Sequence, residues 1–392
     1  MLHTSLSGQL GGLELRLRQE ALMLKGLDVD SVIALNPFPD LDSLIDKLKD
    51  DNIPFVNFSP PPFFEQWKWR RLNKLRAKLI PERALAMGRI DLMHVAMAWT
   101  DTAGTRLWLA HQYGIPAVIS VHNTFPSRSF TAWETKILTK GFRAVKGIYA
   151  VSESALENFL TLFAPFITRG TEISVIPNPV NTKLFKPSNT ARRQLINELN
   201  IPPESTLIGS ACRLDKQKQP ELLIKIFSKL RNRHPDLHLL FIGQGQLRDT
   251  CEALTRDLGL TDRVHFLGFR SDVHKLIAGL DLHILLSTLE GFGIATAEAM
   301  ACGVPVVATD VPGSRDILRA SEAGILVPKT DETTICALVS ELLADAKKRE
   351  AMGNQGPLEV RTRYSLHTVE KQIHDFYSRA LPLAPTKLVT TR

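Results

Sequence analysis

Short apolar runs alternate with amphipathic stretches along the first half of the chain. Runs typical of buried strands lie at 31–35, 53–58, 92–97, 117–121, 147–151 and 173–176. Between them, apolar residues recur at helical spacing, as in 13–25, 41–50, 102–113 and 153–162. Strands that alternate with helices of this length predict right-handed crossovers and a parallel sheet. The first strand is expected to be very short, because few residues precede a glycine-containing turn.

A second alternating set follows an interruption. The stretch VIPNPVNTKLFKP at 175–187 contains three prolines and two asparagines, which marks a linker. Further strand-like runs lie at 207–211, 237–242, 264–267, 282–286, 304–309 and 324–327. The sequence therefore predicts an α/β protein of two doubly wound, Rossmann-like domains that face one another across an interdomain cleft. Ligands of such sheets bind at the carboxyl ends of the strands, so this cleft is the expected site.

The predicted boundaries follow from this alternation. They are an N-terminal domain at 1–178, a C-terminal domain at 179–365, a helix at 366–381 that crosses back to the first domain, and a frayed tail at 382–392.

Composition excludes several protein classes. Hydrophobic residues make up 44% and charged residues 23% of the 392 residues, which is ordinary for a soluble globular protein. The four cysteines show no metal-ligand spacing, so reduced thiols are expected. The chain has no apolar run long enough for a membrane span, and its start lacks the layout of a secretory signal. A cytoplasmic protein is the resulting expectation.

The positive charge is concentrated in one segment. Residues 66–89 carry eight Lys or Arg against one Glu, a net charge equal to the +7 of the whole chain. The remainder is balanced, which argues against a nucleic-acid-binding surface. The segment combines basic and aromatic side chains on one short helix: Trp67, Trp69, Arg70, Arg71 and Lys74. This pattern favours peripheral contact with an anionic membrane surface or acceptor. A solvated basic helix with core aromatics, or an RNA or protein partner, are the alternatives.

The strongest chemical signal is the stretch LEGFGIATAEAMACGVPVVATDVP at 289–312. It predicts a strand, a glycine turn, and a helix that begins near Ile294 and is stopped by Gly303. The free N–H groups at such a helix start suit an anion. Glu298 lies one turn into the helix, where a carboxylate could accept two hydrogen bonds from a ribose diol. Acidic residues that merely favour the helix dipole would explain Glu298, but not its combination with Glu290 and the turn.

These residues resemble a known family. Glu290 and Glu298, eight positions apart, resemble the E-x7-E signature of retaining glycosyltransferase family 4. Other motifs of that family are matched in the same order along nearly the whole chain: GGLE at 11–14, SVHNT at 120–124, VIPNPVNTKLF at 175–185, GSACR at 209–213 with Lys218, GQG at 243–245 and VHFLG at 264–268.

The resemblance implies a GT-B fold, with an acceptor-binding N-terminal domain at 1–178 and a nucleotide-sugar-binding C-terminal domain at 179–365. It also implies a set of site residues. The implied catalytic residues are His122, Arg213, Lys218 and Glu290. The implied donor-binding residues are Gly12, Phe292, Gly293, Ile294 and Glu298. Glu298 would hold the ribose, and Glu290 and His122 would contact the donor sugar. The family needs no divalent metal, and no cofactor is expected; Arg213 and Lys218 would neutralise the leaving diphosphate instead.

Each residue also has a simpler interpretation. Arg213 and Lys218 could be two exposed cations, His122 a loop histidine without function, and Gly12 a turn glycine. The other ten histidines are given no functional role. The sequence departs from the family at Pro179 in the linker, and at Gln219, where a glycine usually follows the clamp lysine. These departures concern hinge details more than donor binding.

The resulting functional hypothesis is a retaining hexosyltransferase. It would move a sugar from a UDP-, GDP- or ADP-sugar to a saccharide or lipid-linked acceptor in envelope polysaccharide or lipopolysaccharide synthesis. The alternatives are a nucleotide-sugar 2-epimerase of the same architecture and a non-catalytic nucleotide-sugar-binding scaffold. A nicotinamide dehydrogenase is disfavoured, because no G-x-G-x-x-G follows the first strand.

Overall fold

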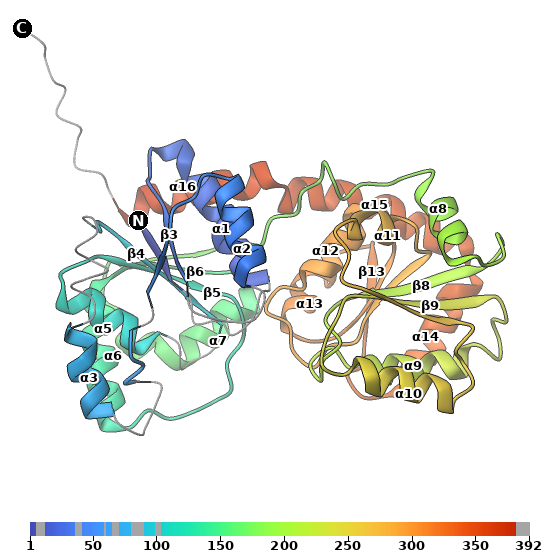
Figure 1. Cartoon of the computed structure of the whole chain (residues 1–392), viewed down its shortest axis with the longest axis horizontal. Helices are drawn as coiled ribbons and strands as arrows, with labels where there is room; N and C mark the ends of the chain where they lie inside the picture. The colour runs from blue at the N-terminus through green and yellow to red at the C-terminus, as the bar shows by residue number, and fades with distance from the viewer. Residues whose placement is uncertain are drawn as a thin grey trace, which may run out of the picture. The chain divides into compact units, whose positions relative to one another are not determined.

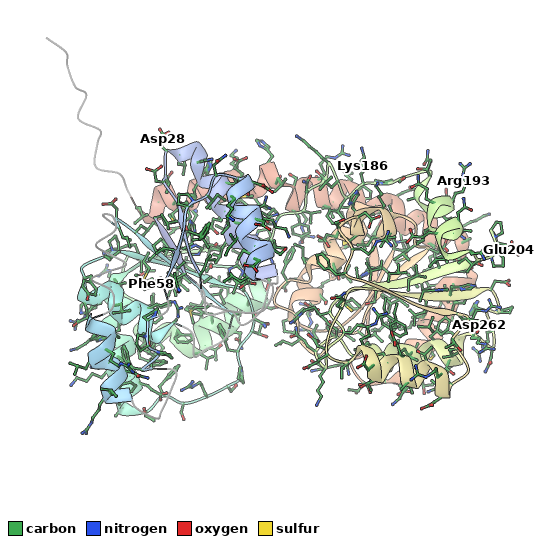
Figure 2. All side chains as sticks on the ribbon, in the orientation of Figure 1. Asp28, Phe58, Lys186, Arg193, Glu204 and Asp262 are labelled. Atoms are coloured by element: carbon green, nitrogen blue, oxygen red, sulfur yellow. The ribbon has the colours of Figure 1, made fainter. Side chains whose placement is uncertain are left out.

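A computed structural model describes residues 1–4, 12–35, 41–58, 60–64, 70–79, 90–98 and 103–381, without the side chains of 70, 78 and 79. The chain divides into two compact units. The first comprises Met1–Pro177 and Val369–Arg392, and the second comprises Asn178–Thr368. In Figure 2 the labelled Phe58 lies inside the first unit, whereas the five labelled charged side chains point outward.

The first unit is built on a seven-stranded parallel sheet of order β3-β2-β1-β4-β5-β6-β7. Its strands are β1 (Leu2–Thr4), β2 (Val32–Leu35), β3 (Phe55–Asn57), β4 (Met93–Met97), β5 (Ala117–Val121), β6 (Val145–Ala150) and β7 (Glu172–Val175). Its helices are α1 (Gly12–Leu24), η1 (Lys25–Leu27), α2 (Leu41–Asp50), α3 (Arg70–Leu79), α5 (Gly104–Gln112), α6 (Ala132–Gly141), η3 (Phe142–Ala144), α7 (Glu153–Phe163), η4 (Ala164–Phe166) and α16 (Leu366–Ala380). The predicted short first strand is confirmed, and it lies in the middle of the sheet.

The second unit is built on a six-stranded parallel sheet of order β10-β9-β8-β11-β12-β13. Its strands are β8 (Thr206–Ala211), β9 (Leu237–Ile242), β10 (Val264–Gly268), β11 (Leu282–Leu285), β12 (Val306–Thr309) and β13 (Gly324–Val327). Its helices are α8 (Ala191–Leu199), α9 (Pro220–Leu230), α10 (Arg248–Asp257), α11 (Val273–Ala278), α12 (Ile294–Ala301), α13 (Pro312–Leu318), α14 (Glu332–Ala344) and α15 (Ala346–Tyr364). Figure 1 shows α9, α10 and α14 on one face of this sheet and α11, α12 and α15 on the other.

Burial on both faces explains why the strands are apolar runs rather than alternating patterns. Every residue of β5 and of β9 is buried. The predicted alternation and the α/β class are therefore confirmed, with small differences at strand ends. The predicted strand at 304–309 was wrong at its start, because Pro305 has no N–H for the ladder and β12 begins at Val306.

Strand order reverses within both sheets. β1 lies between β2 and β4, and β8 lies between β9 and β11. Loops that leave neighbouring strands at such a reversal run in opposite directions and open a crevice at the carboxyl edge of the sheet. In the second unit this crevice belongs to the loops after β8 and β11.

Candidate functional site

Two loops of the second unit are tied together at its reversal point. One follows β8 and carries Arg213 and Lys218; the other follows β11 and carries Glu290. Gln217 Nε2 donates to the carbonyl of Leu289 at 2.7 Å, and the backbone N–H of Thr288 donates to the carbonyl of Gln217 at 2.8 Å. Cross-loop hydrogen bonds of this kind fix the separation of the side chains that the loops carry.

A largely buried ion pair joins these loops. The Lys218 ammonium contacts the Glu290 carboxylate, and their side chains are only 15% and 7% exposed. The Ser287 hydroxyl donates to the same carboxylate oxygen of Glu290 at 2.6 Å. Asp215 accepts from the backbone N–H of Lys218 at 3.1 Å. The structure thus brings together two of the predicted residues, Lys218 and Glu290, in one fixed arrangement.

Arg213 lies on the same loop but is more open. Its guanidinium pairs with Asp215 at 3.1 Å, and its side chain is 42% exposed. Planar guanidinium groups bind phosphate in a bidentate manner, whereas an ammonium acts as a point charge. The loop therefore offers one locked cation and one accessible cation beside the crevice.

Two glycines shape the loop that carries Arg213. A Cβ on Gly243 would collide with the carbonyl of Cys212, and a Cβ on Gly245 would collide with the backbone of Leu214. Gly243 also has a φ of 148°, which other residues rarely adopt. The G-x-G sequence after β9 is therefore required for close packing against the Arg213 loop.

The turn before α12 depends on a glycine in the left-handed conformation. Gly293 has a φ of +92° and precedes the first helical residue, Ile294. The Phe292 ring is 4% exposed and packs edge-on against Tyr364, with 5.2 Å between ring centroids. In the described part of the chain the buried hydroxyl of Thr296, one turn on, has no hydrogen-bond partner. The amides at this helix start are thus the groups suited to an anion.

Glu298 is a partly buried carboxyl whose pKa is raised to about 8 by desolvation. No hydrogen-bond donor for its side chain is found among the described residues. A carboxyl in this state gains from any ligand that brings hydroxyl donors, because the charged form would then be stabilised. Its place one turn into α12 is the predicted one, and its role in holding a ribose stays a prediction.

In the first unit, His122 follows β5 directly. Its backbone N–H donates to the carbonyl of Met97 at 2.8 Å, and its Nε2 lies 2.8 Å from the hydroxyl of Ser120. Desolvation, with a further contribution from Arg16, lowers its pKa to about 3. His122 is therefore neutral at pH 7. Gly12 is the exposed first residue of α1, and a Cβ there would meet no atom within 4 Å.

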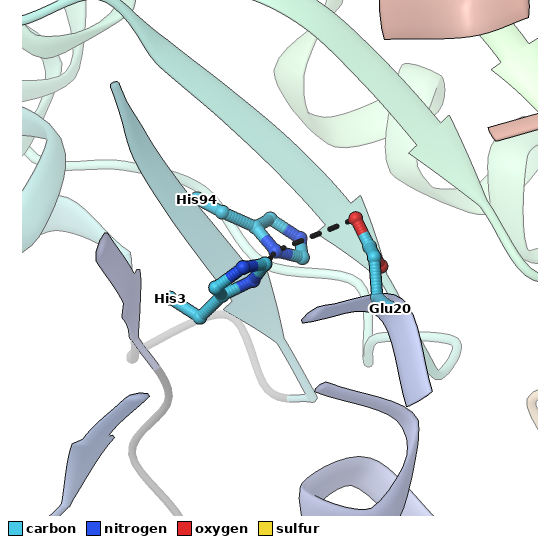
Figure 3. Close-up of side chains that lie close together, drawn as sticks. All are labelled: His3, Glu20 and His94. Atoms are coloured by element: carbon cyan, nitrogen blue, oxygen red, sulfur yellow. Dashed lines mark hydrogen bonds and ion pairs between the residues drawn. The ribbon is translucent and has the colours of Figure 1, made fainter. Parts of the chain in front are cut away.

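The sequence analysis missed a buried polar cluster beneath α1. His3, Glu20 and His94 are all fully buried, and Figure 3 shows the two imidazoles and the carboxylate converging. The two Nδ1 atoms lie 2.9 Å apart, and His94 Nδ1 lies 3.6 Å from Glu20 Oε1. A histidine inside each of two apolar runs was the only sequence signal.

This cluster has the residue types of a metal site but the spacing of hydrogen bonds. These three residues bring their ligand atoms within 4.8 Å of one another. Two nitrogens on a tetrahedral zinc, bound at 2.0–2.1 Å, lie about 3.3 Å apart, which exceeds the observed 2.9 Å. The geometry is that of one imidazole N–H donating to the other imidazole.

The basic segment is only partly described. Trp67 and Trp69 lie outside the described residues, and Arg70 is described only as the first residue of α3. The Nζ of Lys74 lies 5.2 Å from the Trp108 ring centroid, so this cation packs against the first unit's own aromatic residues. Arg71 is exposed, and its contact with a membrane or acceptor stays a prediction. In the described part of the chain, no helix is long and apolar enough to cross a membrane.

Comparison with known proteins shows which families and proteins this chain resembles. A family model described as Glycosyl transferases group 1 matches residues 191–359, and one described as Glycosyltransferase Family 4 matches residues 10–184. An uncharacterized glycosyltransferase of Methanocaldococcus jannaschii is 27% identical over 388 residues, or 95% of each chain. Other relatives, including a putative glycosyltransferase of Bacillus subtilis, align over only about half of their own length.

Two further similarities are informative. The N-acetylgalactosamine-N,N'-diacetylbacillosaminyl-diphospho-undecaprenol 4-alpha-N-acetylgalactosaminyltransferase of Campylobacter jejuni is 34% identical over 157 residues, 40% of this chain and 42% of the relative. The crystal structure of Anabaena HepE in complex with UDP is 23% identical and covers 96% of this chain and 99% of its own, with a TM-score of 0.77. The latter likeness confirms the predicted fold class, with two Rossmann-like units as in GT-B proteins.

Proposed function

We propose, because this chain belongs to glycosyltransferase family 4, that its second unit binds a UDP-, GDP- or ADP-sugar and that the protein transfers the sugar to an acceptor hydroxyl. The observation that carries this proposal is the Lys218–Glu290 pair, fixed beside Arg213 at the strand reversal. The backbone amides at the start of α12 support a diphosphate there, and Glu298 supports a ribose. The UDP held by the structurally similar HepE agrees with such a donor.

The chemistry of the donor explains why two cations, Arg213 and Lys218, would lie beside it. Breaking the bond between the anomeric carbon and the phosphate oxygen builds negative charge on the diphosphate. Arg213 and Lys218 would stabilise that charge, since Lys218 is held in place by Glu290 and the accessible guanidinium of Arg213 lies on the same loop. We therefore propose a reaction that needs neither a divalent metal nor another cofactor. Glu290 would orient Lys218 and contact the donor sugar.

We propose that the configuration of the sugar is retained through attack on the front face. The acceptor oxygen bonds to the anomeric carbon as the carbon–phosphate oxygen bond breaks on the same face. The acceptor proton passes to the departing phosphate oxygen, so charge and atoms balance without a protein base. A neutral His122, with its low pKa, suits this route because it would position hydroxyl groups rather than remove protons.

Site-directed variants test the proposal directly. Arg213→Ala and Lys218→Ala should each reduce sugar transfer or donor hydrolysis by about 10²–10³-fold, the usual loss for one group that stabilises developing charge. Lys225→Ala, on the exposed side of α9, is a matched control and should keep full activity. Unchanged turnover in the first two variants would reject the clamp. An epimerised nucleotide-sugar from donor alone would instead favour the 2-epimerase alternative.

We propose further that the acceptor is a saccharide, carried by a lipid at an anionic membrane surface. One face of α3 supports this: Leu72 and Leu75 are 45% and 59% exposed, and Arg71 and Arg76 beside them are exposed. Exposed leucines flanked by arginines suit the headgroup region of anionic lipids. The Campylobacter relative, named for a diphospho-undecaprenol-linked acceptor, agrees with this acceptor class.

Vesicle flotation tests the membrane proposal. Arg71→Glu/Arg76→Glu and Leu72→Ser/Leu75→Ser should each weaken binding to anionic vesicles. Arg143→Glu/Lys146→Glu makes the same charge change at exposed positions elsewhere in the first unit and should leave binding unchanged. Equal flotation of all three double variants would exclude α3 as the contact surface.

A further inference from the structure

A row of buried polar side chains, called the seam below, crosses the sheet of the first unit, where an apolar core would be expected. It runs across adjacent strands from His3 on β1 to His94 on β4 and Ser120 on β5, all with no exposed surface. The backbone register pairs His3 with His94. The seam ends at His122, the histidine assigned above to the reacting sugar. Buried polar groups of this kind must satisfy one another, so their hydrogens can be assigned.

The seam is a continuous chain of hydrogen bonds. Ser31 Oγ lies 3.1 Å from His3 Nε2, and the two Nδ1 atoms of His3 and His94 lie 2.9 Å apart. His94 Nε2 lies 2.8 Å from Ser120 Oγ, which lies 2.8 Å from His122 Nε2. Each neutral imidazole carries one N–H and one bare nitrogen. A bare ring nitrogen that faces the Ser120 hydroxyl takes its hydrogen, and the Ser120 oxygen can then only accept from the other ring.

Glu20 decides which ring nitrogen of His94 carries the hydrogen. Its Oε1 lies 3.6 Å from His94 Nδ1, close enough for the carboxylate to attract an N–H there and to repel a bare lone pair. Desolvation is outweighed by the electrostatic contributions of His94 and Arg16 and by the hydrogen bond from Tyr149, so the pKa of Glu20 falls to about 2 and the carboxylate is charged. Arg16, whose Nε is 3.9 Å from Glu20 Oε2, is the cation that faces this carboxylate from α1.

The remaining hydrogens follow in sequence. With its hydrogen on Nδ1, His94 donates toward His3 and accepts from the Ser120 hydroxyl through Nε2. The oxygen of Ser120 then accepts from His122, which must carry its hydrogen on Nε2. His122 Nδ1 is left as a bare acceptor. His122 is only partly buried, and its side chain has no described hydrogen-bond partner besides Ser120. The opposite assignment would place the His94 lone pair against the carboxylate.

We propose that Glu20, acting through His94 and Ser120, fixes the tautomer of His122 so that Nδ1 accepts a hydrogen bond from a hydroxyl of the substrate. This inference rests on the proposed sugar transfer for the identity of the substrate. It assigns Glu20, His94 and Ser120 as positioning residues. It also states a selectivity: the group that meets His122 is a hydroxyl donor, and a carboxylate or carbonyl at that place would be rejected.

The C-terminal helix α16 contributes to the orientation of the Glu20 carboxylate. Tyr377 on α16 donates to Glu20 Oε1 at 2.8 Å, and Tyr149 on β6 donates to Oε2. Both tyrosines hold the carboxylate in the orientation that brings Oε1 toward His94. Residues 357 positions apart in the sequence thereby help to set the hydrogen on His122.

Nitrogen-15 NMR of the histidine side chains tests the assignment on the full chain without substrate. In the wild type, two-bond couplings should show His122 protonated on Nε2 and bare on Nδ1, with the His122→Gln spectrum identifying its resonances. Ser120→Ala should remove this bias, so that His122 shows both tautomers. Ser31→Ala is the matched control: among the described residues its hydroxyl is bonded to His3 alone, so its removal should leave the His122 resonances unchanged.

Turnover gives the second measurement. Ser120→Ala should lower kcat by about tenfold with little change in the donor KM, while Ser31→Ala stays within twofold of the wild type. A wild-type His122 protonated on Nδ1, an unaltered His122 spectrum in Ser120→Ala, or full kcat in that variant would overturn the proposal. The NMR result does not depend on the reaction catalysed, so failure of the tautomer assignment is separable from failure of the transferase proposal, which Arg213→Ala tests.

Discussion

The carboxyl of Glu298 should make the second unit less stable as the pH rises from about 4.5 to about 8. Burial raises the pKa of this group to about 8 from the ordinary 4.5. Between these values the folded protein holds a proton that the unfolded chain has released. Stability therefore falls with rising pH across this window and is greatest below the lower value. Glu298→Gln keeps the shape but removes the titration.

The size of the effect follows from the same two values. One unit of pKa corresponds to about 1.4 kcal/mol, so the full interval has an upper limit of about 5 kcal/mol. Glu298 keeps some contact with solvent, which reduces this figure; we expect about 2–4 kcal/mol. Relative to Glu298→Gln, the wild type should lose this amount of unfolding free energy between pH 4.5 and pH 8.

Urea denaturation at a series of pH values measures this difference. All five tryptophans precede residue 134, so their fluorescence reports only the first unit, and circular dichroism must follow the second. Glu350→Gln, an exposed glutamate on α15, serves as the control and should show no such pH-dependent difference. A wild-type-to-Glu298→Gln difference that stays constant from pH 4.5 to pH 8 would refute a desolvated carboxyl at this position.

Three other outcomes are expected. Gly245→Ala should displace the Arg213 loop and lower kcat at least 10-fold. The control is Gly259→Ala, because a Cβ at Gly259 meets no atom within 4 Å. This control should keep full kcat and lose only thermal stability, through its φ of +63°. Gln219→Gly should raise the unfolding free energy by about 0.5 kcal/mol in circular-dichroism melts, because Gln219 adopts a φ of +46°; a loss of stability would contradict this strain. Tyr377→Phe removes a hydrogen-bond donor from Glu20, so the pKa of Glu20 should rise from about 2. Acid unfolding, monitored by tryptophan fluorescence, should then begin at higher pH. An unchanged midpoint would show that Tyr149 alone suffices to hold the pKa of Glu20 low.

Much of the fold was predictable from local sequence. Strands buried on both faces must be apolar runs, and the helices between them must be amphipathic, so the alternation can be read directly. The ranges 41–50, 117–121, 237–242 and 324–327 were predicted to the residue. The turn before α12 was also predictable, because Gly293 takes a positive φ that its neighbours in sequence could not adopt without strain. The departure at Gln219 was visible too, and the structure shows that its φ is one that favours glycine.

The electrostatic state of the site was decided by tertiary structure. Lys218 and Glu290 are 72 positions apart, and only the neighbouring placement of β8 and β11 makes them a pair. His3 and His94 each resemble an isolated polar residue in an apolar run, and they meet because β1 lies beside β4. Periodicity and turn chemistry act over a few residues, so the sequence alone determined the elements and the turns. Hydrogen-bond partners and pKa values depend on desolvation and on charges brought from distant strands, and these came only with the order of the strands in each sheet.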